Sequence, residues 1–141
     1  MADIPVIRNE VDASPDALIE RVTLGAEGKA GEPLYQDGAN GWKPADANAL
    51  ASAQARCLLL GSGVLGTTYP SGAVVDAVFF GKVSGLSGMT PGDRCYVSPT
   101  EGALDQTAPA AAGDYPFVFG WAFAADTIFV QPQTAIPTVN S

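Results

Sequence analysis

Turn-forming residues divide this sequence into short hydrophobic runs, and this feature limits its fold more than any other. Gly and Pro account for 16 and 11 of the 141 residues. Together with Asp and Asn they form turn signals that recur at intervals of about 8 to 12 residues. That spacing is typical of all-β sandwiches and barrels. We therefore expect an all-β fold, a small β-barrel or β-sandwich of about eight short strands.

The runs between the turns predict where the strands lie. Residues 73–83 should form the strongest strand, because they are apolar on both faces, as in a central strand or a barrel wall. Asp37-Gly38 is a strong hairpin signal, and Pro91-Gly92 suits the middle of a type II turn. Further strands are expected at residues 18–24, 34–36, 42–43, 56–60, 94–98, 103–104, 117–123 and 127–130.

One segment, residues 44–55, favours a helix. It is rich in alanine, the residue with the highest helix propensity, but it is short and follows Pro44. We expect at most one short helix here, of one or two turns, with Asp46 as its N-cap.

Four aromatic side chains fall on one face of the strand expected at residues 117–123 if that strand alternates regularly. Small Gly and Ala residues occupy the other face, which would allow close approach of another strand or another subunit. We expect the aromatic face to be part of the core; it consists of Phe117, Phe119, Trp121 and Phe123.

The two ends of the chain lack the pattern of the middle. Residues 1–16 contain two prolines and no clean periodicity, so we expect an extended N-terminal arm. Its apolar side chains, Ile4, Val6 and Ile7, are the candidate contacts to a neighbouring subunit. The β-domain should span residues 17–132, and residues 133–141 should form a loose C-terminal tail.

The charge balance excludes several classes of partner. The formal net charge is −8, with 7 basic against 15 acidic residues, so the chain cannot supply the phosphate neutralisation that nucleic-acid binding requires. It has no basic amphipathic stretch for a membrane surface and no apolar run of about 18 residues for a membrane span. The N-terminus does not resemble a secretion signal. The acidity would favour docking onto a basic surface.

The residue types needed for common catalytic and metal sites are scarce. The chain has no histidine, which removes the commonest general base and metal ligand. Cys57 and Cys95 lie in hydrophobic runs and should be buried free thiols, with a single disulfide as the alternative. We expect no catalytic, cofactor or metal site.

The acidic residues leave two alternatives open. Most of them fall in or beside turns, where Asp bonds nearby backbone amides. A carboxylate-pair hydrolase would need two of them about 5 to 10 Å apart in a cleft, and a loop-bound Ca²⁺ also stays open. The acids concerned are Asp37, Asp46, Asp93, Glu101, Asp105 and Asp114.

The second half of the chain carries a series of turn and strand motifs that belong together. They are Gly81 after the long strand, the G-x-T-P-G-D turn at residues 88–93, Tyr-Val-Ser at 96–98, the T-x-G-x-L-x-Q-T hairpin at 100–107, Gly113-Asp114, and G-W-A followed by T-I-F-V at 120–130. With the upstream stretch GEPLYQDGANGWKPADANA, they resemble a family of small tailed-bacteriophage head proteins, the capsid decoration (cement) or head-fibre proteins. The resemblance covers roughly residues 17–132.

This resemblance implies a structural role in the virion. It implies a β-barrel or β-sandwich that forms a homo-oligomer, commonly a trimer, on the outer capsid surface. The partner would be the major capsid protein of the same phage, no cofactor would be needed, and the arm with Ile4, Val6 and Ile7 could contact the capsid. The alternative is a head- or tail-fibre module that recognises a host-surface glycan or receptor through exposed aromatic residues such as Tyr35, Trp42, Tyr69 or Tyr115.

Overall fold

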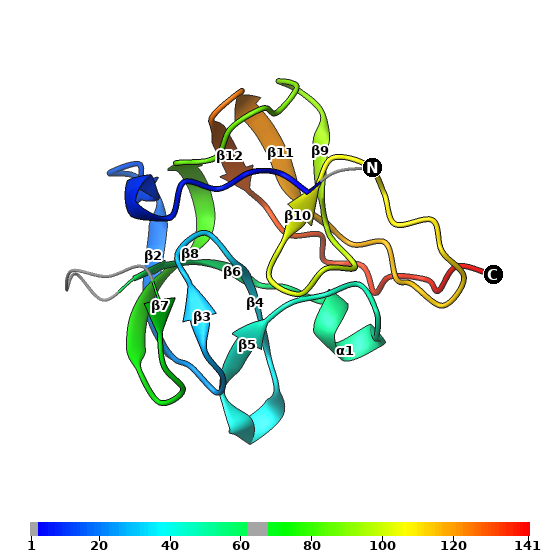
Figure 1. The fold of residues 1–141 in the computed structure, drawn as a ribbon, viewed down its shortest axis with the longest axis horizontal. Coiled ribbons are helices and arrows are strands. Elements are labelled where there is room, and N and C mark those ends of the chain that lie inside the picture. The colour runs from blue at the N-terminus through cyan, green and yellow to red at the C-terminus, as the bar shows by residue number, and fades with distance from the viewer. Residues whose placement is uncertain (1–2, 62–67) are drawn as a thin grey trace.

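The protein folds around one antiparallel sheet that curls into a half-barrel (Figure 1). The computed structural model describes residues 3–61 and 68–141. The expectation of an all-β fold is confirmed. The strands of the described residues are β1 (Asp12–Ala13), β2 (Leu18–Thr23), β3 (Gly28–Lys29), β4 (Pro33–Gln36), β5 (Trp42–Pro44), β6 (Cys57–Gly61), β7 (Thr68–Tyr69), β8 (Val74–Ser84), β9 (Arg94–Val97), β10 (Leu104–Asp105), β11 (Val118–Ala124) and β12 (Thr127–Val130).

Strand β8 organises the sheet, whose order is β10-β9-β11-β12-β8-β6-β4-β5. The first half of β8 pairs with β6 and β2, and its second half pairs with β12 and β1. Figure 1 shows β8 between the two groups of strands. Eleven mostly apolar residues let it serve both groups, as its hydrophobic pattern predicts.

The interior divides into two hydrophobic clusters on either side of this strand. The larger contains Phe117, Phe119, Ile128 and Val130 from β11, β12 and the segment before them. The smaller gathers Leu24, Leu34 and Leu59 between the strands of the other half. Each cluster therefore draws on residues far apart in the sequence, as expected for a fold built on non-local strand pairing.

The predicted strands are all present, with shifts of one or two residues at their ends. Three two-residue strands, β1, β3 and β7, were not expected. β3 and β7 pair only with each other, as a small separate sheet. Such short pairings carry too few residues for a periodic pattern. The glycine-rich sequence of residues 61–72 also predicts a loop, of which residues 62–67 lie outside the described residues.

The predicted turns and the short helix are present. Gly92 has φ 90 and the Asp93 amide donates to the Thr90 carbonyl, which fits the expected turn. The helix α1 (Leu50–Ala53) is a single turn, and two 3₁₀ turns occur at Arg8–Glu10 and Gly38–Asn40. The N-cap prediction is wrong: Ala49 occupies that position.

Asp46, the residue predicted as the N-cap, makes other hydrogen bonds. Asp46 accepts hydrogen bonds from the Asn48 amide and the Ser52 hydroxyl at 2.9 Å each. It therefore holds the loop that precedes the helix together and contacts the helix through a side chain rather than through a terminal amide.

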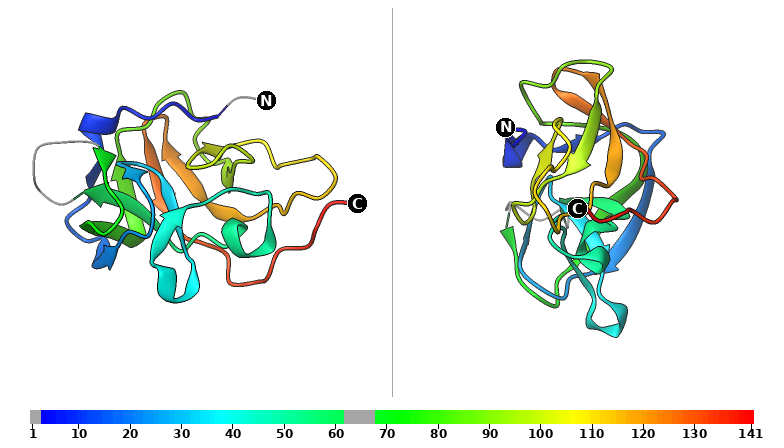
Figure 2. Two further views of the ribbon diagram at one scale, coloured as in Figure 1. Left: turned by 60° about the horizontal axis from the view of Figure 1, so that its bottom comes forward. Right: turned by 90° about the vertical axis from the view of Figure 1, so that its right-hand side faces the viewer.

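The N-terminal segment is extended, but it packs on its own domain. The Ile4 amide donates to the Leu104 carbonyl at 2.7 Å, the Ile7 amide donates to the Gly85 carbonyl at 2.7 Å, and the Ser98 hydroxyl donates to Asp3. Figure 2 shows the segment lying along the body of the protein. The expectation of a separate arm is therefore wrong, because Ile4 is buried in the core and Val6 packs against it.

The C-terminal residues are likewise held by hydrogen bonds rather than loose. The Gln133 amide donates to the Val118 carbonyl at 2.9 Å, and the Asn140 amide donates to the Asp114 carbonyl at 2.8 Å. The Asn140 side chain also donates to the Pro109 carbonyl. The tail thus runs beside the connector at residues 107–116 (Figure 2). No helix of the described residues is long and apolar enough to cross a membrane.

Candidate functional site

A β-bulge in β11 sends two of the four aromatic side chains of residues 117–123 to the surface. Phe117 and Phe119 are fully buried, whereas Trp121 is half-buried and Phe123 is 49% exposed. The pairing of β11 with β9 shifts register between Val118 and Gly120. Because side chains alternate with a period of two, one extra residue moves all later side chains to the opposite face.

The prediction that all four aromatic residues are buried is therefore right for two and wrong for two. Gly120 makes the bulge possible, since a Cβ there would lie 2.1 Å from the Phe129 carbonyl oxygen. This glycine, in the middle of an aromatic run, was the sequence signal that strict alternation would fail.

The outward aromatic residues form a continuous surface on three neighbouring strands. The Phe80 and Phe129 rings meet edge to face, with centroids 5.1 Å apart. Trp121 stacks on Phe129 with ring centroids 5.3 Å apart, and its centroid lies 6.0 Å from that of the tilted Phe123 ring. Phe80 is 47% exposed. We call this surface the aromatic face; its members are Phe80, Trp121, Phe123 and Phe129.

An exposed leucine extends the aromatic face at one end. Leu18 on β2 lies opposite Phe80 and is 53% exposed. Scattered exposed apolar side chains are ordinary, whereas contiguous ones mark surfaces that bind a partner. The aromatic face is therefore the strongest candidate for a functional surface among the described residues.

Two cations lie at opposite sides of the aromatic face. Lys82 pairs with Phe129 across β8 and β12, and Arg94 pairs with Trp121 across β9 and β11. The Lys82 ammonium lies 4.3 Å from the centroid of the Phe123 ring, a cation–π contact. The ion pairs between described residues are Arg21–Asp76 and Lys43–Asp37, so neither Lys82 nor Arg94 is in one.

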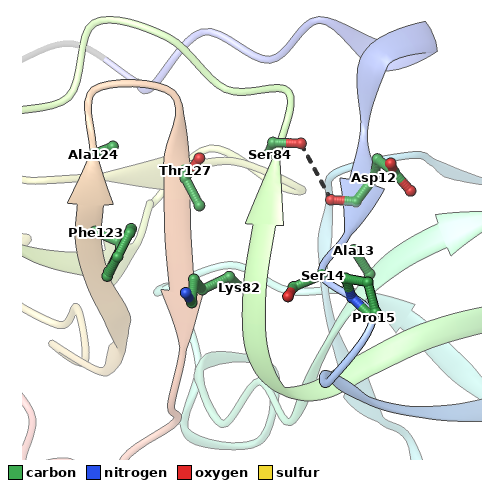
Figure 3. Close-up of a pocket in the computed structure, with 9 residues that line it drawn as sticks. All are labelled: Asp12, Ala13, Ser14, Pro15, Lys82, Ser84, Phe123, Ala124 and Thr127. Atoms are coloured by element: carbon green, nitrogen blue, oxygen red, sulfur yellow. Dashed lines mark hydrogen bonds between the residues drawn. The ribbon is translucent and has the colours of Figure 1, made fainter.

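A groove of about 360 Å³ opens beside the aromatic face. Figure 3 shows it over the end of β8, between the turn that joins β11 to β12 and the segment at residues 12–15. The Ser84 hydroxyl donates to the Asp12 carbonyl across it. Its lining carries one acidic residue, Asp12, so this groove does not supply the carboxylate pair of a hydrolase. The lining residues are Asp12, Ala13, Ser14, Pro15, Lys82, Ser84, Phe123, Ala124 and Thr127.

The three apolar residues predicted as contacts in the N-terminal segment do not form one surface. Ile4 is 8% exposed and belongs to the larger core cluster, so its side chain is not available to a partner. Val6 is half-buried against the same cluster and bridges to Leu86. Ile7 is 40% exposed and is the one that keeps an accessible apolar side chain.

The aromatic residues named for glycan binding are also anchored in the interior. Tyr69 is buried, and Trp42 packs edge to face on Phe79 at 5.6 Å. Tyr35 and Tyr115 pack against the larger core cluster, whereas Trp42 and Tyr69 belong to the smaller one. The structure does not bring these four together, and the most exposed aromatic rings of the described residues are Phe80 and Phe123, both of the aromatic face.

Both cysteines are buried and free, as expected, and no disulfide joins them. Burial raises the pKa of the Cys57 thiol far above its usual range. Burial, with a smaller effect of the Asp93 charge, raises the pKa of Cys95 to about 12. Thiols of this kind are not ionised near neutral pH and are poor nucleophiles.

The buried carboxylates hold loops. Glu32 accepts a hydrogen bond from the Lys29 amide at 2.7 Å, and desolvation raises its pKa. Asp105 accepts one from the Thr107 amide at 2.8 Å. Within residues 3–61 and 68–141, no group of three His, Cys, Asp or Glu residues could hold a metal ion.

No protein-family model matches this chain, and no curated protein matches it in sequence.

Proposed function

We propose that this protein is a structural virion protein that binds the outer surface of an assembled tailed-bacteriophage capsid and stabilises it. The observation that carries the proposal is the aromatic face, a contiguous set of rings on β8, β11 and β12 of which Phe80 and Phe123 are each about half exposed. The resemblance of residues 17–132 to capsid decoration and head-fibre proteins supports it. The partner would be the major capsid protein of the same phage.

Burying the exposed rings would contribute favourable free energy to such docking. A Phe side chain has about 150 to 250 Å² of surface, and Phe80 and Phe123 are each about half exposed. Burying both would remove about 200 Å² of apolar surface, or ~5 kcal/mol before the costs of association. Trp121, Phe129 and Leu18 would add to this contribution.

The stabilising mechanism would be mass action. A protein that binds the assembled shell and not its separate subunits shifts the equilibrium toward the shell. Many copies on one shell would add their effects. We further propose that the protein acts as a homo-oligomer, with a trimer as the expected form, so that each oligomer contacts several capsid subunits at once and gains by multivalency.

The test is co-sedimentation with undecorated capsids of the same phage. The wild type should sediment with the shells and raise their melting temperature. The double substitution Phe80→Ser with Phe123→Ser should abolish both effects, because it removes the exposed halves of two rings. Ile136→Ser is the matched control, since Ile136 is 71% exposed and lies on the C-terminal tail. A wild type that does not sediment with shells, or a double variant that binds as well as the wild type, contradicts the proposal.

One observation favours a second candidate, a fibre module that binds a host-surface glycan. The groove beside Phe123 combines an aromatic wall with hydroxyl groups, and sugars are bound by such combinations of apolar and polar groups. Binding of the isolated protein to host cells, with no binding to capsids, would support this candidate instead.

A further inference from the structure

We propose that the aromatic face, together with Lys82 and Arg94, docks an extended acidic segment of the partner protein, with a carboxylate at each end of a short apolar stretch. This names the chemistry of the partner at the docking surface and therefore rests on the proposed function. The occupant is a protein segment that lies across the strands, over Phe129 and Trp121, and does not add a strand to the sheet.

The strand pairings fix the geometry of this surface. Lys82 lies opposite Phe129, Phe129 opposite Trp121, and Trp121 opposite Arg94. The four residues thus form one row across β8, β12, β11 and β9, a cation at each end and two stacked rings between them. Neighbouring strands are about 4.8 Å apart, so three steps separate the Cα atoms of the two cations by about 14 Å.

An extended peptide matches this distance with a simple pattern. Its residues rise about 3.4 Å each, so positions i and i+4 lie about 14 Å apart on the same face. Position i+2 also points to that face and would lie over the Phe129 and Trp121 rings. The pattern that fits the row is therefore an acidic residue, a large apolar residue two positions later, and a second acidic residue two positions after that.

The local charge of the row, in contrast to the net charge of the chain, matches an acidic partner. The protein has a net charge of −8, yet the row carries two cations that form no ion pair with the described residues. The hydrogen bond from the Ser14 hydroxyl is the main cause that lowers the pKa of Asp16, and the charge of Lys82 makes a smaller contribution. Asp93 precedes Arg94 in the chain. These carboxylates lie beside the row, and the row itself contains none.

A contact within the protein restricts the Lys82 side chain before any carboxylate binds. Its ammonium group rests over the Phe123 ring at 4.3 Å, which lowers the entropy lost on binding. It also lines the groove, where Figure 3 shows it at the side of Phe123 and Thr127. The groove gives the partner chain room to leave the surface at this end of the row.

The hydroxyl groups of the groove donate their hydrogen bonds within the protein. The Ser14 hydroxyl donates to Asp16, the Ser84 hydroxyl to the Asp12 carbonyl, and the Thr127 hydroxyl to Asp126. Their protons are already used, so Lys82 remains the main donor in the groove. A cationic donor is strongest toward a carboxylate.

The test titrates the isolated full-length protein with the peptide Gly-Ser-Asp-Val-Leu-Val-Asp-Ser-Gly and follows the indole NMR signal of Trp121. The control peptide has Asn in place of both Asp residues. The acidic peptide should shift the Trp121 signal and bind more weakly as salt is added, and the Asn peptide should bind at least tenfold more weakly. Equal binding of the two peptides, or no binding of the acidic one, overturns the proposal.

Substitutions of the two cations test where the two carboxylates of the peptide bind. Lys82→Gln and Arg94→Gln should each lower the affinity for the acidic peptide about threefold to fivefold, as expected for exposed ion pairs. Arg56→Gln is the control, because Arg56 is an exposed cation outside the row whose side chain bonds Gln54. If Lys82→Gln and Arg94→Gln bind the peptide as Arg56→Gln does, the proposal is wrong. An acidic oligosaccharide such as oligogalacturonate that binds in place of the peptide also overturns it.

The outcomes separate this inference from the proposed function. If the double variant Lys82→Gln with Arg94→Gln binds capsids at full affinity, the inference of an acidic segment is wrong and the proposal of capsid binding is unaffected. Peptide binding by a protein that does not bind capsids supports the inference about the surface and contradicts the capsid role.

Discussion

Replacing Phe119 by alanine should mainly reduce stability and replacing Phe123 by alanine should mainly weaken docking, although the two residues lie four positions apart on one strand. Phe119 points into the core and is fully buried, whereas Phe123 points outward and is 49% exposed. The register shift between Val118 and Gly120 causes this difference. Without the bulge, both rings would lie on the same face.

The magnitudes follow from burial. Removing a fully buried Phe costs about 3 to 5 kcal/mol. For Phe123 the buried half of the ring amounts to about 100 Å², so the loss is at most ~2.5 kcal/mol. With an unfolding entropy of ~2.1 cal/mol/K per residue, a chain of 141 residues has ~0.3 kcal/mol/K in total. Phe119→Ala should therefore lower the melting temperature by about 10 to 17 °C, and Phe123→Ala by at most about 8 °C.

Thermal unfolding followed by circular dichroism measures both values, and co-sedimentation at a temperature where both variants are folded measures docking. We expect Phe119→Ala to bind capsids like the wild type and Phe123→Ala to bind more weakly. If Phe123→Ala is the more destabilised of the two, the orientation assigned to these rings is wrong.

Three further predictions test other parts of the structure. Ile4→Ala should lower the free energy of unfolding by about 2 to 3 kcal/mol because Ile4 is a core residue, whereas Ile7→Ala, at an exposed position, should lower it by well under 1 kcal/mol in denaturant unfolding. Equally small effects of the two substitutions would show that the N-terminal segment does not pack on the core. Burial raises the pKa of Glu32 from its usual 4.5, so the folded state favours the protonated form and stability falls as pH rises from about 4.5 through the raised pKa. Glu32→Gln should remove this decrease in stability with rising pH, whereas the control Glu20→Gln should retain it. An unchanged pH dependence of unfolding in Glu32→Gln would show that Glu32 does not cause the decrease. Native protein at pH 8 should resist alkylation at both cysteines by mass spectrometry, and modification of Cys95 at the rate of an unfolded control would show that this thiol is accessible.

The sequence predicted the strands well because their signals are local. Val74–Ser84 is mostly apolar, and Asp37-Gly38 and Pro91-Gly92 mark turns by backbone preferences that no distant residue has to supply. The burial of Cys57 and Cys95 also followed from the apolar runs around them.

The features missed from the sequence depend on contacts between distant segments. Ile4 is buried because Leu104, a hundred positions later, accepts its amide hydrogen bond, and a proline-broken segment gives no periodic sign of this. The aromatic face arises from a bulge and from the pairing of β11 with β9 and β12. Strict alternation placed Trp121 and Phe123 in the core. Gly120 signals a break in the alternation, but the outward position of the two rings is established by the register of three strands.

Oxidative footprinting of the aromatic face on assembled particles tests the central claim most directly. Hydroxyl radicals should oxidise Trp121, Phe80 and Phe123 in the isolated protein, since all three have solvent-accessible rings. On capsids, we expect these residues to be strongly protected while Ile136 is oxidised as before. Oxidation of the aromatic face at the same rate in free and capsid-bound protein would show that another surface makes the contact.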